Sequence, residues 1–62
     1  MIEIWYIYKS KLDKNYHWGE TKFSSPRKAL AFMYKFKDVF MNFEWVCENP
    51  EDNEYLWRHF KP

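Results

Sequence analysis

The side chains with catalytic or metal-binding chemistry are few in this chain and stand far apart. The two histidines, His17 and His59, and the single cysteine, Cys47, do not follow the ligand spacing of a zinc site. The acidic segment 48–54 lacks the glycine and the closing carboxylate spacing of a calcium loop. We therefore expect no metal, no cofactor and no catalytic residue, and we interpret the chain as a non-enzymatic protein.

Aromatic side chains are the chemistry that this chain has in quantity. Four Trp, five Tyr and six Phe stand beside a single Gly in 62 residues, a composition unlike that of a disordered chain. Residues 1–62 suffice for a single small domain. Such a domain has little room for both a core and a ligand cavity, which typically occupies about 300 to 1,000 Å³. Binding is therefore favoured over catalysis.

A β-hairpin is predicted in the first part of the chain. Residues 2–9 are β-branched and aromatic, and residues 16–23 alternate aromatic residues and threonine with polar ones, which is typical of strands. The polar segment 10–15 between them is expected to turn the chain. Gly19 in the second strand is expected to mark a β-bulge.

The register of this hairpin decides which aromatic residues face water. With Lys9 opposite Tyr16, one face carries aromatic and charged residues, while the other face is apolar and suits a core. One or two helices cover only one side of a three-stranded sheet, so the first face would remain in water. A three-residue turn at 13–15 would instead flip the second strand and disperse these residues. The expected exposed set, called the aromatic patch, is Trp5, Ile7, Tyr16 and Trp18.

A helix over 26–41 and a third strand over 43–48 are predicted next. Ser25 before Pro26 indicates a helix start, because serine accepts hydrogen bonds from first-turn amides and proline at the first position loses none. The strand would place Cys47 in the core as a small apolar residue. The apolar stripe of the helix, expected to be core, is Ala29, Phe32, Met33, Phe36, Val39 and Phe40.

Residues 49–62 have two interpretations. As a helix, Asn49 would cap the first turn and Pro50 would follow it, with acidic residues at the start and basic residues at the end, as the helix dipole favours. As a strand, this segment would set Glu48 against Glu54 beside its turn. We therefore predict an α+β fold, a hairpin followed by a helix and a strand (ββαβ) and then a short helix; the alternative is a fourth strand (ββαββ). The apolar side of the last helix would be Leu56, Trp57 and Phe60.

Charge does not single out one class of partner. The formal net charge is +1, but residues 1–42 carry eight basic and four acidic side chains, or +4, and residues 43–62 carry two and five, or −3. Basic residues interleaved with aromatic ones are typical of single-stranded nucleic-acid platforms, so nucleic acid is the alternative partner, bound less tightly as salt rises. The lysines of this alternative are Lys9, Lys11, Lys14 and Lys22.

The favoured function is docking of the aromatic patch on a larger protein, which the chain would inhibit or modulate. Central aromatic residues within a polar rim are the composition of a binding hot spot. In size and composition the chain resembles small accessory proteins of phages and mobile elements, and this resemblance implies an inhibitor. A structural homodimer that buries the same patch is a further alternative.

The expected location is the cytoplasm. A single cysteine forms no intramolecular disulfide, although small extracellular domains usually depend on such bonds. No apolar run approaches the roughly 18 residues that a membrane span requires, so no membrane contact is expected.

Overall fold

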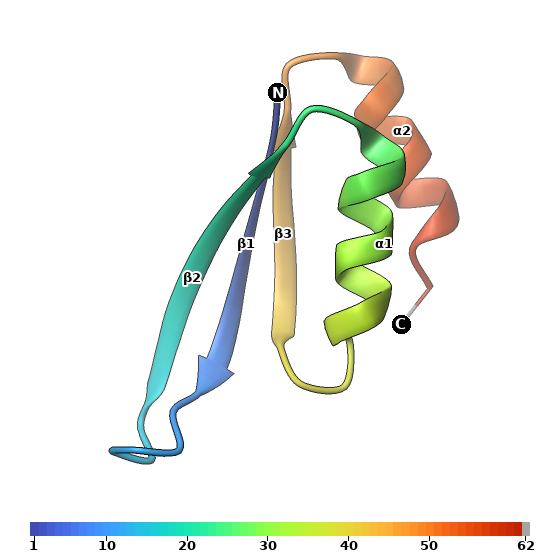
Figure 1. The fold of residues 1–62 in the computed structure, drawn as a ribbon. Helices are drawn as coiled ribbons and strands as arrows, with labels where there is room; N and C mark the ends of the chain where they lie inside the picture. The colour runs from blue at the N-terminus through green and yellow to red at the C-terminus, as the bar shows by residue number, and fades with distance from the viewer. Residues whose placement is uncertain (62) are drawn as a thin grey trace.

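The chain begins with the predicted hairpin. The computed structural model describes residues 1–61, in which β1 (Ile2–Lys9) pairs antiparallel with β2 (Tyr16–Phe23) (Figure 1). Lys9 lies opposite Tyr16, which confirms the predicted register and excludes the three-residue turn. The alternation of side chains explains this register, because shifting one strand by a single residue would move its apolar set to the other face.

Gly19 does not mark a β-bulge. The pairing of β1 with β2 runs without a shift, and Gly19 lies directly opposite Tyr6. A Cβ atom at Gly19 would lie 2.6 Å from the Tyr6 ring, so the glycine leaves the space that this ring occupies. The register shifts instead between Trp5 and Ile7, where β1 pairs with the third strand.

The third strand makes β1 the central strand of the sheet. β3 (Met41–Cys47) pairs antiparallel with β1, which gives the strand order β2-β1-β3. The predicted range was 43–48, so β3 begins two residues earlier and ends one residue earlier than predicted. Asn42 adopts a left-handed conformation with φ 54°, which asparagine tolerates better than most residues.

Both helices begin where the sequence predicts. Helix α1 (Pro26–Phe36) follows Ser25, whose side chain accepts a hydrogen bond from a first-turn N–H. Helix α2 (Pro50–His59) follows Asn49, whose side chain does the same. The last segment is therefore a helix, and the alternative of a fourth strand is wrong.

Helix α1 ends at Phe36, five residues earlier than predicted. The N–H groups of Val39 and Phe40 both donate to the Phe36 carbonyl, so the chain leaves the helix in a turn toward β3. This turn leaves Val39 62% exposed, and its assignment to the core is wrong. Phe40 still reaches the core side, where its ring stacks on Tyr6 with 4.2 Å between ring centroids.

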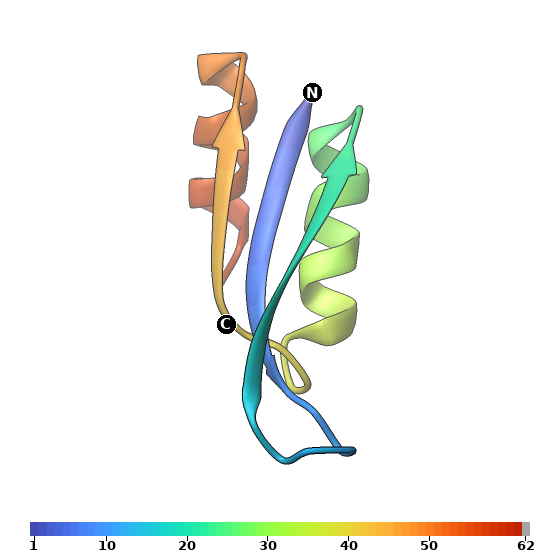
Figure 2. The same cartoon turned by 90° about the vertical axis from the view of Figure 1, so that its left-hand side faces the viewer.

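Both helices pack on the same face of the sheet, so the domain is an α+β structure of two layers with the order ββαβα (Figures 1 and 2). The Tyr34 hydroxyl of α1 donates to the His59 carbonyl and accepts from the Lys61 N–H, which ties α1 to the end of α2. Within residues 1–61, no helix is long and apolar enough to cross a membrane. The fully buried residues between the layers are Ile2, Ile4, Ala29, Met33 and Leu56.

Candidate functional site

The face of the sheet opposite the helices is open. Figure 2 looks onto this face, with both helices behind the strands, and no element formed by the described residues covers it. Ile2 and Ile4 are buried under the helices, so the odd positions of β1 point the other way. Cross-strand partners share a face, and the register therefore assigns to the open face Glu3, Trp5, Ile7 and Lys9 of β1, Tyr16, Trp18, Glu20 and Lys22 of β2, and Glu44 and Val46 of β3.

The predicted aromatic patch lies together on this open face. The rings of Trp5 and Trp18, diagonal neighbours on adjacent strands, have centroids 6.0 Å apart and are tilted by 36°. Trp18 is 69% exposed, Tyr16 is 62% exposed and Trp5 is 44% exposed, while Ile7 is half-buried between the neighbouring strands. The patch therefore consists of exposed rings on the adjacent strands β1 and β2, of which Trp5 and Trp18 are in contact.

A shallow hollow of about 340 Å³ adjoins the two tryptophans. Its apolar wall is formed by Trp5, Ile7 and Trp18, and its polar wall by Asn42 and Glu44 of β3. The hollow therefore exists only because β3 lies beside β1, a pairing that brings residues far apart in the sequence together.

Comparison with known proteins adds nothing to this geometry. No family model, curated protein or solved structure matches the chain. A role for the open face must be argued from its own residues.

The four lysines of the nucleic-acid alternative do not converge on one site. Lys22 lies opposite Glu3, and its Nζ atom is 3.5 Å from a Glu3 carboxylate oxygen. Lys9 stands at the other end of β1, with its Nζ 5.8 Å from the centre of the Tyr16 ring. Lys11 and Lys14 lie in the exposed turn beyond β1. A continuous track of cations along the aromatic patch is therefore not formed.

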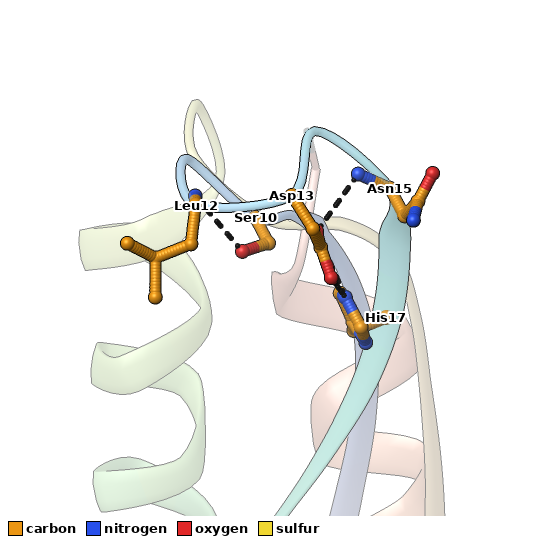
Figure 3. Close-up of polar contacts among 5 residues, drawn as sticks. All are labelled: Ser10, Leu12, Asp13, Asn15 and His17. Atoms are coloured by element: carbon orange, nitrogen blue, oxygen red, sulfur yellow. Dashed lines mark hydrogen bonds and ion pairs between the residues drawn. The ribbon is translucent and has the colours of Figure 1, made fainter.

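The hairpin turn is closed by its own hydrogen bonds and projects beyond the rest of the molecule (Figures 1 and 3). The N–H of Leu12 donates to Ser10 Oγ at 3.2 Å, and the N–H of Asn15 donates to Asp13 Oδ1 at 3.0 Å. His17 Nε2 lies 2.9 Å from Asp13 Oδ2. These contacts hold the turn in one shape, with the Leu12 side chain pointing away from them and 97% exposed.

Acid should loosen this turn. The N–H of Asn15, and then the ring of His17, hold the pKa of the Asp13 carboxyl below its ordinary value of 3.8. A pKa lowered by folding means that the carboxylate stabilises the turn above about pH 4 and stops doing so as the pH falls through the folded-state pKa. We expect the NMR signals of the Asn15 amide and the His17 ring to share a transition below pH 3.8, absent in Asp13→Ala. A shared transition above that value would contradict the assignment.

Sequence reasoning missed three exposed apolar residues. Leu12 is the one apolar residue in an otherwise polar turn, and this position in the sequence could have indicated that its side chain is exposed. Met41 and Val46 belong to β3 and are both exposed. The alternation of β3, with Phe43 and Cys47 packed against the core, was the signal that Val46 faces outward.

A second hollow, of about 480 Å³, lies on the helix side between β3 and the end of α2. It is lined mainly by aromatic rings, among them Phe43, Trp45 and Phe60, which also pack against the core. The ring of Trp57 lies 5.1 Å from that of Trp45 but is 68% exposed, so its placement on the buried side of α2 is wrong, whereas Leu56 is fully buried. Because the same rings support the fold, this hollow is the weaker candidate for a dedicated site.

Cys47 and the histidines do not form a reactive group. Burial, with a smaller effect from Asp52, raises the pKa of the Cys47 thiol, which lowers its thiolate fraction and its reactivity. His17 lies on β2 and contacts Asp13 of the hairpin turn, and His59 lies at the end of α2 against the ring of Tyr55. No group of three His, Cys, Asp or Glu side chains within residues 1–61 is arranged to hold a metal ion.

Proposed function

We propose that this protein is a binding module that docks the open face of its sheet on a larger protein and inhibits or modulates that partner. The observation that supports this function is the asymmetry of the sheet. Two helices cover one face, whereas the other face presents Trp5, Tyr16 and Trp18 to water. Tryptophan and tyrosine are the residues most enriched among those that contribute strongly to protein binding, and exposed apolar clusters are characteristic of interaction sites.

Contact between the two tryptophans of the patch supports the same proposal. Trp5 and Ile7 belong to the central strand, and Trp18 packs against Trp5 from the neighbouring strand. Side chains that are already held in place lose less conformational entropy on binding, so more of the contact energy is available for affinity.

The charges of the open face favour a protein partner over nucleic acid or a second copy. Trp5 is flanked by Glu20 on one side and Glu44 on the other. These carboxylates would repel a phosphate backbone at the position where a base would stack. In a symmetric dimer centred on Trp5, the carboxylates of both copies would face one another. A protein partner whose contact surface carries no dense negative charge would not be repelled by these carboxylates.

The test is retention of a partner from nuclease-treated cell lysate by the wild type and by single alanine variants. Trp18→Ala is expected to weaken the complex by about 2 kcal/mol, or about 30-fold, while the fold persists because the ring is largely exposed. Trp57→Ala is the matched control, since it removes an equally exposed tryptophan that belongs to α2 and lies outside the aromatic patch.

Three results would contradict the proposal. Equal loss of the partner in the Trp57→Ala control would show that the open face has no special role. Retention that is seen only without nuclease treatment and that falls steeply with salt would support the nucleic-acid alternative. Stability that rises with protein concentration, without any other bound protein, would support the homodimer.

A further inference from the structure

A row of three side chains crosses the centre of the open face. Trp5 on β1 pairs with Glu20 on β2 and with Glu44 on β3. Directly opposed residues on neighbouring strands have Cβ atoms about 4.5 to 5.5 Å apart. The two carboxylates therefore stand on either side of the Trp5 ring, within reach of any group that rests on it.

Neither of these carboxylates has a cation partner among the described residues. Glu3, in the adjacent row, is the carboxylate that Lys22 contacts, and Lys9 lies over the ring of Tyr16. Within residues 1–61, no Lys, Arg or His nitrogen lies within 4 Å of a carboxylate oxygen of Glu20 or Glu44. The centre of the patch therefore combines exposed indole rings with two uncompensated negative charges.

The hollow beside this row matches one kind of side chain. Its walls are the indoles of Trp5 and Trp18 on one side and the acceptors of Asn42 and Glu44 on the other. A guanidinium is planar, weakly hydrated and rich in donors, so it stacks on an aromatic face and donates to a carboxylate at the same time. An ammonium group is a compact and strongly hydrated charge that gains less from the apolar wall.

We propose that the hollow receives an arginine side chain of the partner protein, stacked on the indoles of Trp5 and Trp18 and paired with Glu44 or Glu20. This inference rests on the proposed docking function and names the partner's chemistry: a basic surface with an exposed arginine. It also accounts for the two glutamates, which a purely apolar docking face would not need at its centre.

The experiment is an NMR titration of the wild type with two blocked tripeptides, Gly-Arg-Gly and Gly-citrulline-Gly, followed through the indole N–H signals. The arginine peptide is expected to shift the signals of Trp5 and Trp18 and to leave that of Trp57 unchanged. Citrulline keeps the shape of arginine without its charge, so its peptide is expected to bind about two- to fivefold more weakly. Equal affinities for arginine and citrulline, a predominant shift of Trp57, or no shift with the arginine peptide would overturn the inference.

A pair of double variants separates charge at this site from charge elsewhere. Glu20→Gln with Glu44→Gln is expected to weaken binding of the arginine peptide about two- to fivefold. Glu51→Gln with Glu54→Gln changes the net charge equally on α2 and is expected to leave the affinity unchanged. If both double variants weaken binding equally, the effect is one of net charge and the inference fails.

The same variants distinguish this inference from the docking function. If Trp18→Ala releases the captured partner but Glu20→Gln with Glu44→Gln retains it at full affinity, the face docks without an arginine. In that case the docking function stands and the arginine inference is overturned. Loss of the partner in both variants, each with an unchanged unfolding midpoint, supports the two together.

Discussion

Replacing Leu56 by alanine is expected to lower the free energy of unfolding by about 2 to 5 kcal/mol. The side chain is fully buried, and it is the one completely buried residue that α2 contributes to the core among residues 1–61. A domain below about 70 to 80 residues rarely has more than about 3 to 5 kcal/mol of stability. Leu56→Ala should therefore remove a large part of the stability of the domain. Urea unfolding followed by far-UV circular dichroism measures the change.

The neighbouring residue provides the control for this prediction. Trp57 belongs to the same helix but is largely exposed, and its main aromatic contact is with the ring of Trp45. Its replacement by alanine should cost only about 0.5 to 1.5 kcal/mol, the contribution of an aromatic pair. A Leu56→Ala protein as stable as the wild type would mean that α2 is not part of the cooperative core.

Replacing Gly19 by alanine is expected to destabilise the protein by about 1 to 3 kcal/mol, the usual cost of inserting a methyl group into a filled space. The new Cβ would lie 2.6 Å from the Tyr6 ring. That ring has little freedom to move away, because it stacks on Phe40 at 4.2 Å and lies 5.7 Å from the ring of Phe32. Thermal or chemical unfolding of the single variant measures the loss.

A double-mutant cycle tests whether the clash with Tyr6 is the cause. In a Tyr6→Ala background, the added methyl group no longer meets the Tyr6 ring, and alanine is favoured over glycine in a strand because glycine loses more conformational entropy. Gly19→Ala should then be neutral or slightly stabilising in that background. An equal cost in both backgrounds would instead attribute the effect to the backbone of β2, and the assigned role of Gly19 would be wrong.

The features that sequence reasoning recovered depend on short-range patterns. Alternation of apolar and polar residues was enough to predict the two strands of the hairpin and to leave two possible registers, because every second side chain of a strand shares a face. Asn49 followed by Pro50 was enough to predict the start of α2, because capping involves only the atoms of one turn. The members of the aromatic patch follow from the hairpin register alone.

The features that sequence reasoning missed depend on contacts between distant segments. The end of α1 at Phe36 and the exposure of Val39 follow from the turn that leads the chain into β3. The exposure of Trp57 follows from how α2 lies against β3, which helical periodicity does not contain.

The candidate site also combines features that the sequence predicts with features that depend on the tertiary structure. By itself, the sequence limited the hairpin to two registers, because antiparallel pairing across a short turn is local. In the register that predicts the aromatic patch, Trp5 and Trp18 share a face and Glu20 stands opposite Trp5. Only the tertiary structure decided between these two registers and placed Glu44 beside Trp5, because β3 reaches β1 through a helix and a turn. That placement depends on burying the apolar faces of the sheet and helices together, which is a property of the whole chain.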